Sequence, residues 1–334
     1  MSGVSAGPVR AAMVPVTRRV RAYFAPVDRT TEQPAVFDPA KYGAFDLASP
    51  PAPWVDLGWI DNFQRFCGTN TEALRAGPLG AVSGQFRGPL DARVDFDFRE
   101  WGKLQMALAA GSQHMNVLAS DPSAAAQPSG GSALTALAVL GGSTASQIAL
   151  GAGVVDSFAV GDLVAVDVDY TGQTGYVGTG IAGAYVADAT VINPDTHYIR
   201  RVTFNVGRVA SKTLTALVLA QPLLGGAPAA GASVQKVVAF LDREGGAFFQ
   251  EWSGLFVAEE DSGGRACFYY PQLSARMAAG AQGFQREEAV EVVKPVAALG
   301  LRASFVALPS LDGNDGVTVL CYRSYFPAAA SGVY

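Results

Sequence analysis

The residues that decide the fold are Val94–Leu108, VDFDFREWGKLQMAL, in which a strand pattern changes directly into a helix pattern. In the first half, Val94, Phe96 and Phe98 alternate with charged residues. Successive side chains of a strand point to opposite faces, so alternation with a period of two is typical of a half-buried strand. The sequence therefore predicts a strand over 92–98 with one apolar and one charged face.

The second half of this stretch predicts a short helix. Apolar residues, among them Trp101, Leu104 and Leu108, recur there at helical spacing between residues of good helix propensity. Gly111 follows them, and glycine commonly ends a helix because it adopts the left-handed conformation without strain. We expect one helix, over Trp101–Ala110.

Strand and turn signals continue on both sides of this stretch. Upstream, Trp54–Phe63 and residues 81–86 indicate earlier strands. Downstream, apolar runs bounded by turn residues indicate strands at 247–257, 266–270, 290–294, 300–308 and 317–326. The sequence LDGNDG, Leu311–Gly316, predicts a turn before the last of them. The chain is therefore expected to be mainly β.

Residues 132–240 are expected to form a separate small β-barrel or sandwich. The preceding Ser120–Gly131, SDPSAAAQPSGG, has the composition of a linker. Within the unit, β-branched runs at 158–170, 198–206 and 214–219 are separated by glycine-rich turns. We interpret this unit as an insertion between two halves of one domain.

The first fifty residues predict an extended N-terminal arm. They are rich in proline and small residues, and Val20–Val27 indicates an edge strand within them. The aromatic residues Tyr23 and Phe24 favour an arm that binds a neighbouring subunit. The first fifteen residues lack the basic region and apolar core of a signal peptide, and no apolar run reaches the ~20 residues of a membrane span, so we expect no membrane insertion.

The composition favours self-association. Hydrophobic residues make up 49% of the chain and charged residues 16%, whereas charged residues make up about a quarter of a typical soluble domain. A surface with so few charges would carry large apolar patches, which usually mark interfaces. The net charge is −5, and the densest basic cluster is Arg18–Arg21. Stable nucleic-acid binding is therefore not expected, while transient, non-specific passage of DNA is compatible with this charge.

The sequence contains few residues or motifs that are typical of catalysis. It contains two histidines, His114 and His197, and none of the GxSxG, Walker A or HExxH motifs. Gly178–Gly183 imitates a dinucleotide-binding loop but has no βαβ unit around it. We therefore expect a protein that is not an enzyme and that holds no cofactor.

Two further groups of polar residues have structural interpretations. Asp162, Asp167 and Asp169 suit either the wet face of a strand or a structural calcium ion, and the sequence leaves both open, although we expect no metal site. The three cysteines, Cys67, Cys267 and Cys321, are expected to be unpaired structural thiols, which places folding in the cytoplasm.

Several of these segments together resemble one known family. The strand-to-helix step at Val94–Leu108, the entry Trp54–Ile60, and the later strands Cys267–Pro271 and Leu301–Pro309 are similar to those of tail tube proteins of long-tailed bacteriophages and related injection machines. The resemblance covers residues 54–118 and 247–327. It implies a tail-tube-like β-sandwich or barrel with one short helix.

The resemblance also implies an organisation and a function. It divides the chain into an arm (1–50), a first half of the tube domain (51–120), an inserted β domain (132–240) and a second half (241–334). Homohexameric rings, or trimeric rings if two tube-like domains lie in tandem, would stack into a hollow conduit for DNA or effectors. The arm and a loop at about 64–90 would bridge subunits or rings. Such a subunit is assembled in the host cytoplasm, contacts other tail proteins and resides in the virion tail.

Six aromatic residues are candidates for the subunit interface: Tyr23, Phe24, Trp54, Trp59, Phe86 and Trp101. Two other functions stay open. One is another tail component, such as a terminator, hub or decoration protein. The other is a carbohydrate-binding adhesive module, for which the inserted unit offers an aromatic platform of Tyr170, Tyr176, Tyr185 and Tyr198.

Overall fold

The protein is described from a computed structural model. The structure describes residues 17–27, 31, 33–76, 81–100, 102–119, 136–167, 205–223, 226–243, 251–261, 263–276 and 301–327. These residues form two large antiparallel sheets, a small two-stranded sheet and one α-helix. The prediction of a mainly β fold is therefore confirmed.

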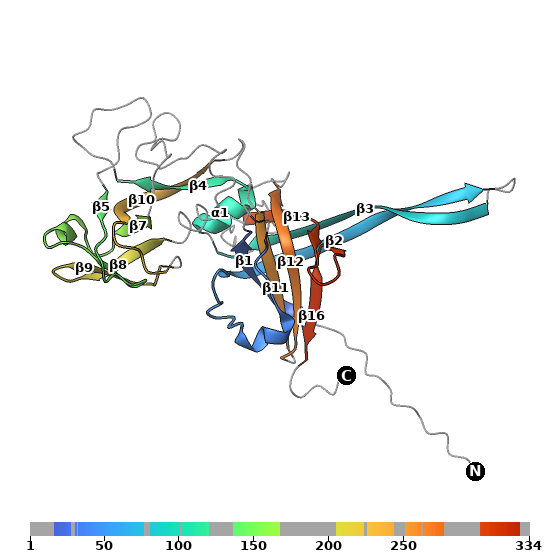
Figure 1. The fold of residues 1–334 in the computed structure, drawn as a ribbon, viewed down its shortest axis with the longest axis horizontal. Helices are drawn as coiled ribbons and strands as arrows, with labels where there is room; N and C mark the ends of the chain where they lie inside the picture. The colour runs from blue at the N-terminus through green and yellow to red at the C-terminus, as the bar shows by residue number, and fades with distance from the viewer. Residues whose placement is uncertain are drawn as a thin grey trace, which may run out of the picture.

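A closed antiparallel barrel forms the body of the molecule (Figure 1). Its strand order is β11-β1-β2-β3-β13-β12, and it closes where β11 pairs with β12. The strands are β1 (Thr17–Pro26), β2 (Val55–Ala76), β3 (Ala81–Phe98), β11 (Glu251–Glu260), β12 (Arg265–Arg276) and β13 (Leu301–Ala307). A seventh strand, β16 (Tyr322–Phe326), pairs with the first part of β12.

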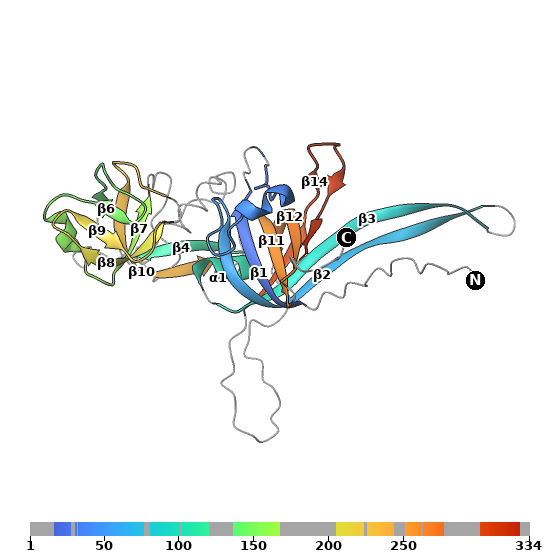
Figure 2. The same ribbon diagram turned by 90° about the horizontal axis from the view of Figure 1, so that it is seen from below.

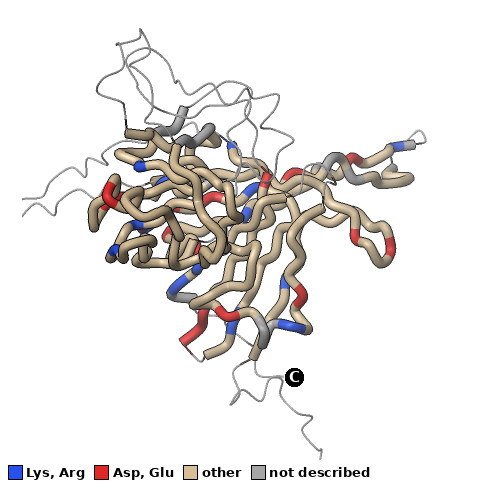
Figure 3. The backbone as a smooth tube through the Cα atoms, turned by 60° about the vertical axis from the view of Figure 1, so that its left-hand side comes forward, with Lys and Arg blue, Asp and Glu red and all other residues tan. Residues whose placement is uncertain are grey.

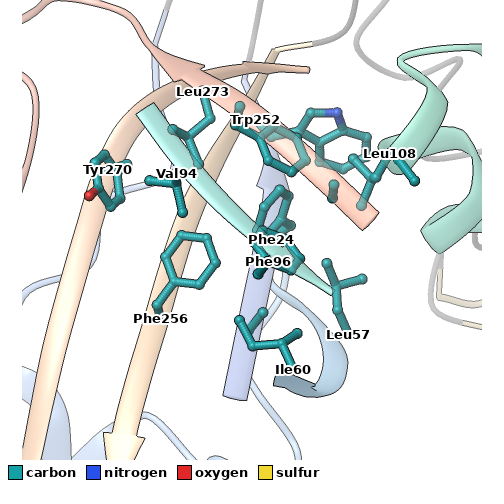
Figure 4. Packing of buried hydrophobic residues seen from close by; sticks show 14 of the residues in the cluster. Phe24, Leu57, Ile60, Val94, Phe96, Leu108, Trp252, Phe256, Tyr270 and Leu273 are labelled. Atoms are coloured by element: carbon teal, nitrogen blue, oxygen red, sulfur yellow. The ribbon is translucent and has the colours of Figure 1, made fainter. Parts of the chain in front are cut away.

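The apolar face predicted for the stretch at 94–98 lines the barrel core. Val94 and Phe96 lie among the buried side chains of the barrel (Figure 4). Phe98 is buried as well, and Phe96 stacks on Phe305 of β13 with ring centroids 5.7 Å apart. The opposite face was predicted to be solvated, and Asp95 departs from that prediction. It is buried, and its burial is compensated by a hydrogen bond from Ser304 at 2.7 Å and by Arg93 at 3.1 Å.

The predicted helix is present as α1, Lys103–Ala110. It ends at Gly111, whose φ of 60° is the left-handed conformation expected of a terminating glycine. Leu104 and Leu108 point into the barrel cluster, and the helix packs against β12 and β13. Trp101, the first residue of the predicted helix, lies outside the described residues.

The predicted edge strand of the N-terminal arm is instead an interior strand of the barrel. β1 pairs with β11 on one side and with β2 on the other, so Phe24 lies opposite both Gly254 and Val55. The sequence around β1 carries no sign of β11, because the two strands are far apart in the chain. An assignment from local pattern alone therefore missed the second partner.

The residues after β1 pack on the outside of the same barrel. We call residues 33–54 the strap; it contains the 3-10 helix η1 (Pro39–Ala44). Its aromatic residues Phe37, Phe45 and Trp54 form a second buried cluster with side chains of β1, β11 and β12. The described part of the predicted arm is therefore docked on its own subunit rather than extended.

Strands β2 and β3 continue far beyond the barrel as one hairpin (Figures 1 and 2). Their register runs without a gap in pairing from Gln64 opposite Asp95 to Ala76 opposite Ala81, apart from two shifts. The prediction of a loop at about 64–90 was wrong. The predicted strand at 81–86 lies within β3, whereas the outer part of β2 was not predicted as a strand because its residues are paired but mostly exposed.

A second sheet lies on the other side of the barrel from the hairpin (Figure 1). Its order is β4-β10-β7-β8-β9-β6, and β5 also pairs with β10. Its strands are β4 (Gln113–Leu118), β5 (Leu137–Ala138), β6 (Gln147–Ala149), β7 (Leu163–Asp167), β8 (Val206–Lys212), β9 (Ala216–Leu219) and β10 (Ser233–Arg243). The sheet and the 3-10 helix η2 (Val154–Ser157) enclose a core of their own.

One strand of this second sheet comes from outside residues 132–240. β4 falls in the predicted first half of the tube domain, but it pairs with β10 along Val237–Arg243. The predicted strand at 198–206 lies mostly outside the described residues, and the one at 290–294 lies wholly outside them.

The predicted turn at Leu311–Gly316 is confirmed. It joins β14 (Ser310–Leu311) and β15 (Thr318–Val319), which form the small sheet. The Asp312 carboxylate accepts a hydrogen bond from the backbone N–H of Asn314 at 2.8 Å. Gly316 has a φ of 72°, a conformation that favours glycine.

Candidate subunit interface on the projecting hairpin

The hairpin leaves the barrel at a β-bulge. Asp61 pairs with Asp97 and Gln64 with Asp95, so β2 carries one extra residue at this point. Asn62 within the bulge has a φ of 53°, and its amide donates a hydrogen bond to Asp97 at 2.6 Å. A bulge bends its strand and increases the local twist. The bulge therefore marks the bend between the barrel and the projecting part.

Beyond the barrel, neither edge of the hairpin pairs with another strand of the described part of the chain. We call residues 66–76 and 81–92 the outer hairpin. β1 pairs with β2 only as far as Ile60, and β13 pairs with β3 only as far as Arg93. Each edge of the outer hairpin therefore presents backbone N–H and C=O groups that can pair with another strand. Pro89 lacks an N–H group, so the β2 edge offers the more regular row of donors.

The outer hairpin also exposes large apolar side chains. Phe86 is 49% and Leu90 54% exposed, and the other members of the group are Phe66, Leu74 and Val82. A two-stranded hairpin is marginally stable by itself, and clustered exposed apolar residues usually mark a contact surface.

Three of these side chains share one face of the outer hairpin. Phe66 and Leu74 are an even number of residues apart on β2, so they lie on the same side. Phe86 belongs to that side as well, because it is opposite Glu72, and directly opposed residues share a face. The Arg93 guanidinium lies 4.4 Å from the Phe66 ring centroid on this face. The face combines apolar area with charged groups, as subunit interfaces commonly do.

Three of the six residues predicted for the interface are instead core residues. Tyr23 and Phe24 are fully buried, and Trp54 is 6% exposed. Tyr23 donates a hydrogen bond to the carbonyl of Leu47, and Trp54 packs edge-on against Phe45 of the strap. The subunit's own barrel and strap therefore cover these three side chains.

The other three predicted residues differ in position. Trp59 is half-buried, with the guanidinium groups of Arg19 and Arg21 at 5.8 and 5.5 Å from its ring. Phe86 is exposed on the outer hairpin and stays a candidate interface residue. Trp101 lies outside the described residues. Phe86 lies within residues 64–90, the segment that was also predicted to bridge subunits, so the outer hairpin stays a candidate interface.

The acidic group considered for calcium has a structural role at Asp162. Its carboxylate lies 2.7 Å from the Lys236 ammonium and accepts a hydrogen bond from the Ala159 N–H at 2.9 Å. Burial raises the pKa of Asp162, but these two partners outweigh it and hold that pKa below its ordinary value. The Asp167 side chain and all of Asp169 lie outside the described residues, and no group of three or more His, Cys, Asp or Glu among the described residues is arranged to hold a metal ion.

Other predicted features are tested only in part. All three cysteines are unpaired, as predicted, and burial raises the pKa of the Cys267 thiol to about 12. The His114 side chain, His197, the glycine-rich Gly178–Gly183 and the aromatic platform of Tyr170, Tyr176, Tyr185 and Tyr198 lie outside the described residues.

Comparison with protein families and with curated proteins identifies no relative of this chain. No protein-family model matches the chain, and no curated protein matches it. Within the described ranges, no helix has the length and apolar character needed to cross a membrane. Function is therefore inferred from the residues of this chain and their geometry.

Proposed function

We propose that the chain is a structural subunit of a phage-type tail tube, which associates with copies of itself into rings that stack around a hollow conduit for DNA or effectors. The observation that carries this proposal is the outer hairpin, with its two unpaired edges and its exposed apolar face. The closed barrel beside α1 agrees with the fold that the resemblance to tail tube proteins implies.

The outer hairpin suits strand pairing between subunits. Its eleven β2 residues, 66–76, reach about 36 Å at ~3.3 Å per residue, long enough to lie along a neighbouring barrel. A strand edge of one copy that pairs with a different strand of the next copy makes a heterologous contact. Such a contact repeats around a ring until the ring closes, or continues as a stack.

The apolar face alone gives a weak contact. Fully burying one large apolar side chain stabilises by about 1.5–3 kcal/mol. The three side chains of this face, which are already about half-buried, would then contribute on the order of 3 kcal/mol. Association itself costs an estimated ~4–15 kcal/mol. A single contact is therefore reversible, and a stable assembly depends on strand pairing together with ring closure.

The charge distribution fits a passive conduit. Lys and Arg residues are interspersed with Asp and Glu over the described part of the molecule (Figure 3), and the net charge of the chain is −5. DNA would pass such a surface with transient, non-specific contacts, since tight binding needs a concentrated basic face. In this arrangement the second sheet faces outward, other tail proteins contact the ends of the stack, and the subunit resides in the virion tail.

Sedimentation velocity and negative-stain microscopy over a wide concentration range test the proposal. We expect rings, and at higher concentration tubes, whose images give the number of subunits per ring. A protein that stays monomeric at every concentration contradicts the proposal. Closed rings that never stack would identify a terminator, hub or similar tail component instead.

A further inference from the structure

The base of the hairpin is held to the barrel by two neighbouring side chains of β2. Phe63 packs its ring 4.9 Å from Phe256 and 5.9 Å from Phe268. Arg65, two residues further on, lies on the same side of the strand. Phe63 lies within the bulged segment between Asp61 and Gln64, and Arg65 follows that segment. The attachment therefore sits at the point where the hairpin turns away from the barrel.

Arg65 joins three strands at this point. Its Nε donates a hydrogen bond to the Tyr270 hydroxyl of β12 at 2.6 Å, and a terminal nitrogen lies 3.4 Å from the Cys321 sulfur, one residue before β16. The guanidinium also lies over the Phe268 ring, 4.3 Å from its centroid. A planar cation that stacks on a ring and donates along its edge has one preferred orientation. Arg65 therefore constrains the angle of β2 as well as its position.

This attachment lies at the base of the outer hairpin, so a small rotation there moves the far end by a large distance. Beyond it, Phe66, Cys67, Gly68 and residues 71–75 are exposed. A rotation of about 10° at the base moves the end of a ~36 Å strand by about 6 Å, which exceeds the ~4.8 Å between paired strands. A small loss of angular precision at Arg65 is therefore enough to prevent strand pairing at the tip.

We propose that Arg65 is a positioning residue, which fixes the direction of the hairpin and so sets whether neighbouring subunits can pair. The second half of this inference rests on the proposed function. Arg65 acts from inside the subunit, between β2, β12 and β16, and not as a contact residue of the interface. Phe63 supplies the apolar part of the attachment, so loss of Arg65 changes the precision of the hairpin and leaves the barrel folded.

The positioning role is tested on the monomer by the distance between two spin labels. The labels are placed at Leu74→Cys on the outer hairpin and at Lys41→Cys on the strap, both exposed, in a Cys67→Ser background. The remaining thiols react poorly, because burial raises the pKa of both Cys267 and Cys321. We expect a narrow distance distribution for the parent and a clearly broader one for Arg65→Met. An equally narrow distribution for Arg65→Met would overturn the proposal.

Two further variants separate positioning from folding. Tyr270→Phe removes only the hydroxyl that accepts from Arg65, and we expect an intermediate broadening. If Arg65→Met does not fold, Tyr270→Phe serves as the test variant in its place. Arg323→Met removes an exposed arginine of β16 and should leave the distribution unchanged, so equal broadening in this control would contradict a specific role for Arg65.

The effect on assembly is measured separately with unlabelled protein. We expect Arg65→Met to raise the concentration needed for assembly at least tenfold while its melting stays cooperative. Wild-type protein that assembles, together with an Arg65→Met variant that assembles equally well, overturns the inference and leaves the proposed function standing. Wild-type protein that never assembles defeats the proposed function, and the label distances still decide whether Arg65 positions the hairpin.

Discussion

The ring of Phe24 lies 5.1 Å from the ring of Phe305, so the first strand of the barrel packs against one of the last. The same ring contacts Trp252 and Phe256 of β11. The N-terminal segment is thus a structural part of the barrel, although its composition is that of an arm.

Deletion of residues 1–50 is expected to abolish folding. The deletion removes β1, opens the barrel between β11 and β2, and takes away most of the strap. Circular dichroism and thermal melting of the purified protein check this. Deletion of residues 1–16 is the matched control, since it keeps every described strand. A soluble 51–334 fragment that melts cooperatively would show that β1 is dispensable.

Phe96→Asp is expected to unfold the barrel. Phe96 is 1% exposed among other aromatic rings, and truncating a buried phenylalanine costs about 3–5 kcal/mol even before a charge is buried. Phe66→Asp places the same change on the outer hairpin, where the side chain is exposed, and should alter the free energy of unfolding little. Chemical denaturation of both variants compares the two sites. Equal stability of both would mean that Phe96 does not belong to the core.

Phe86→Asp is expected to block self-association while the subunit stays folded. The side chain is exposed in the monomer, so stability should change by less than about 0.5 kcal/mol, whereas a charge on the apolar face opposes its burial between subunits. Leu214→Asp, at an 88% exposed position after β8 in the second sheet, is the control. Sedimentation velocity should show assembly of the control and monomers of Phe86→Asp. Normal assembly of both would exclude Phe86 from the interface.

Stability is expected to fall at alkaline pH. Burial raises the pKa of the Cys267 thiol from 9.0 to about 12, and burial likewise raises the pKa of Tyr270 from 10.0 to about 12. The folded chain then holds these protons more tightly than the unfolded chain does. Their stabilisation is complete below pH 9 and is lost as the pH rises from 9 through 12. Melting temperatures at pH 7, 9 and 11 should fall less for Cys267→Ala than for wild type. An equal fall in both proteins would show that the Cys267 thiol does not contribute to the pH dependence.

Asp95→Ala is expected to destabilise the barrel by about 2–4 kcal/mol. The change leaves the Ser304 hydroxyl without its buried acceptor and removes the carboxylate that forms an ion pair with Arg93. Asp61 pairs with Arg99 at 2.7 Å on the surface, and Asp61→Ala should have a far smaller effect because water replaces the lost partner. Urea unfolding midpoints compare the two. A smaller loss for Asp95→Ala than for Asp61→Ala would contradict the burial argument.

Local pattern predicted those elements whose burial is visible within a few residues. The alternation at Val94, Phe96 and Phe98 reflects one face in the core, and Gly111 ends α1 by a conformation that depends on glycine alone. The turn at Leu311–Gly316 is equally local. In these places the conformation and burial of a residue follow from residues close to it in the sequence.

Long-range pairing was not predictable in the same way. β1 resembles an edge strand until β11 is known to lie beside it, and Tyr23, Phe24 and Trp54 resemble contact residues until the strap is seen to cover them. The outer hairpin has the opposite character. Its strands are held mainly by pairing, and the charged Glu72 lies on the same face as Phe66 and Leu74, so the apolar alternation of β2 is interrupted.

The position of β1 between β2 and β11 also has a consequence for synthesis of the chain. When β1 leaves the ribosome, its partner Glu251–Glu260 has not been translated, so the side chains of Tyr23 and Phe24, which are buried on opposite faces of β1 in the folded protein, stay exposed until the last third emerges. The second sheet draws on closer segments and can be completed first. Barrels whose contacts join distant residues fold slowly and expose apolar strands to aggregation. Chaperone dependence during expression is therefore expected to trace to β1 and not to the hairpin.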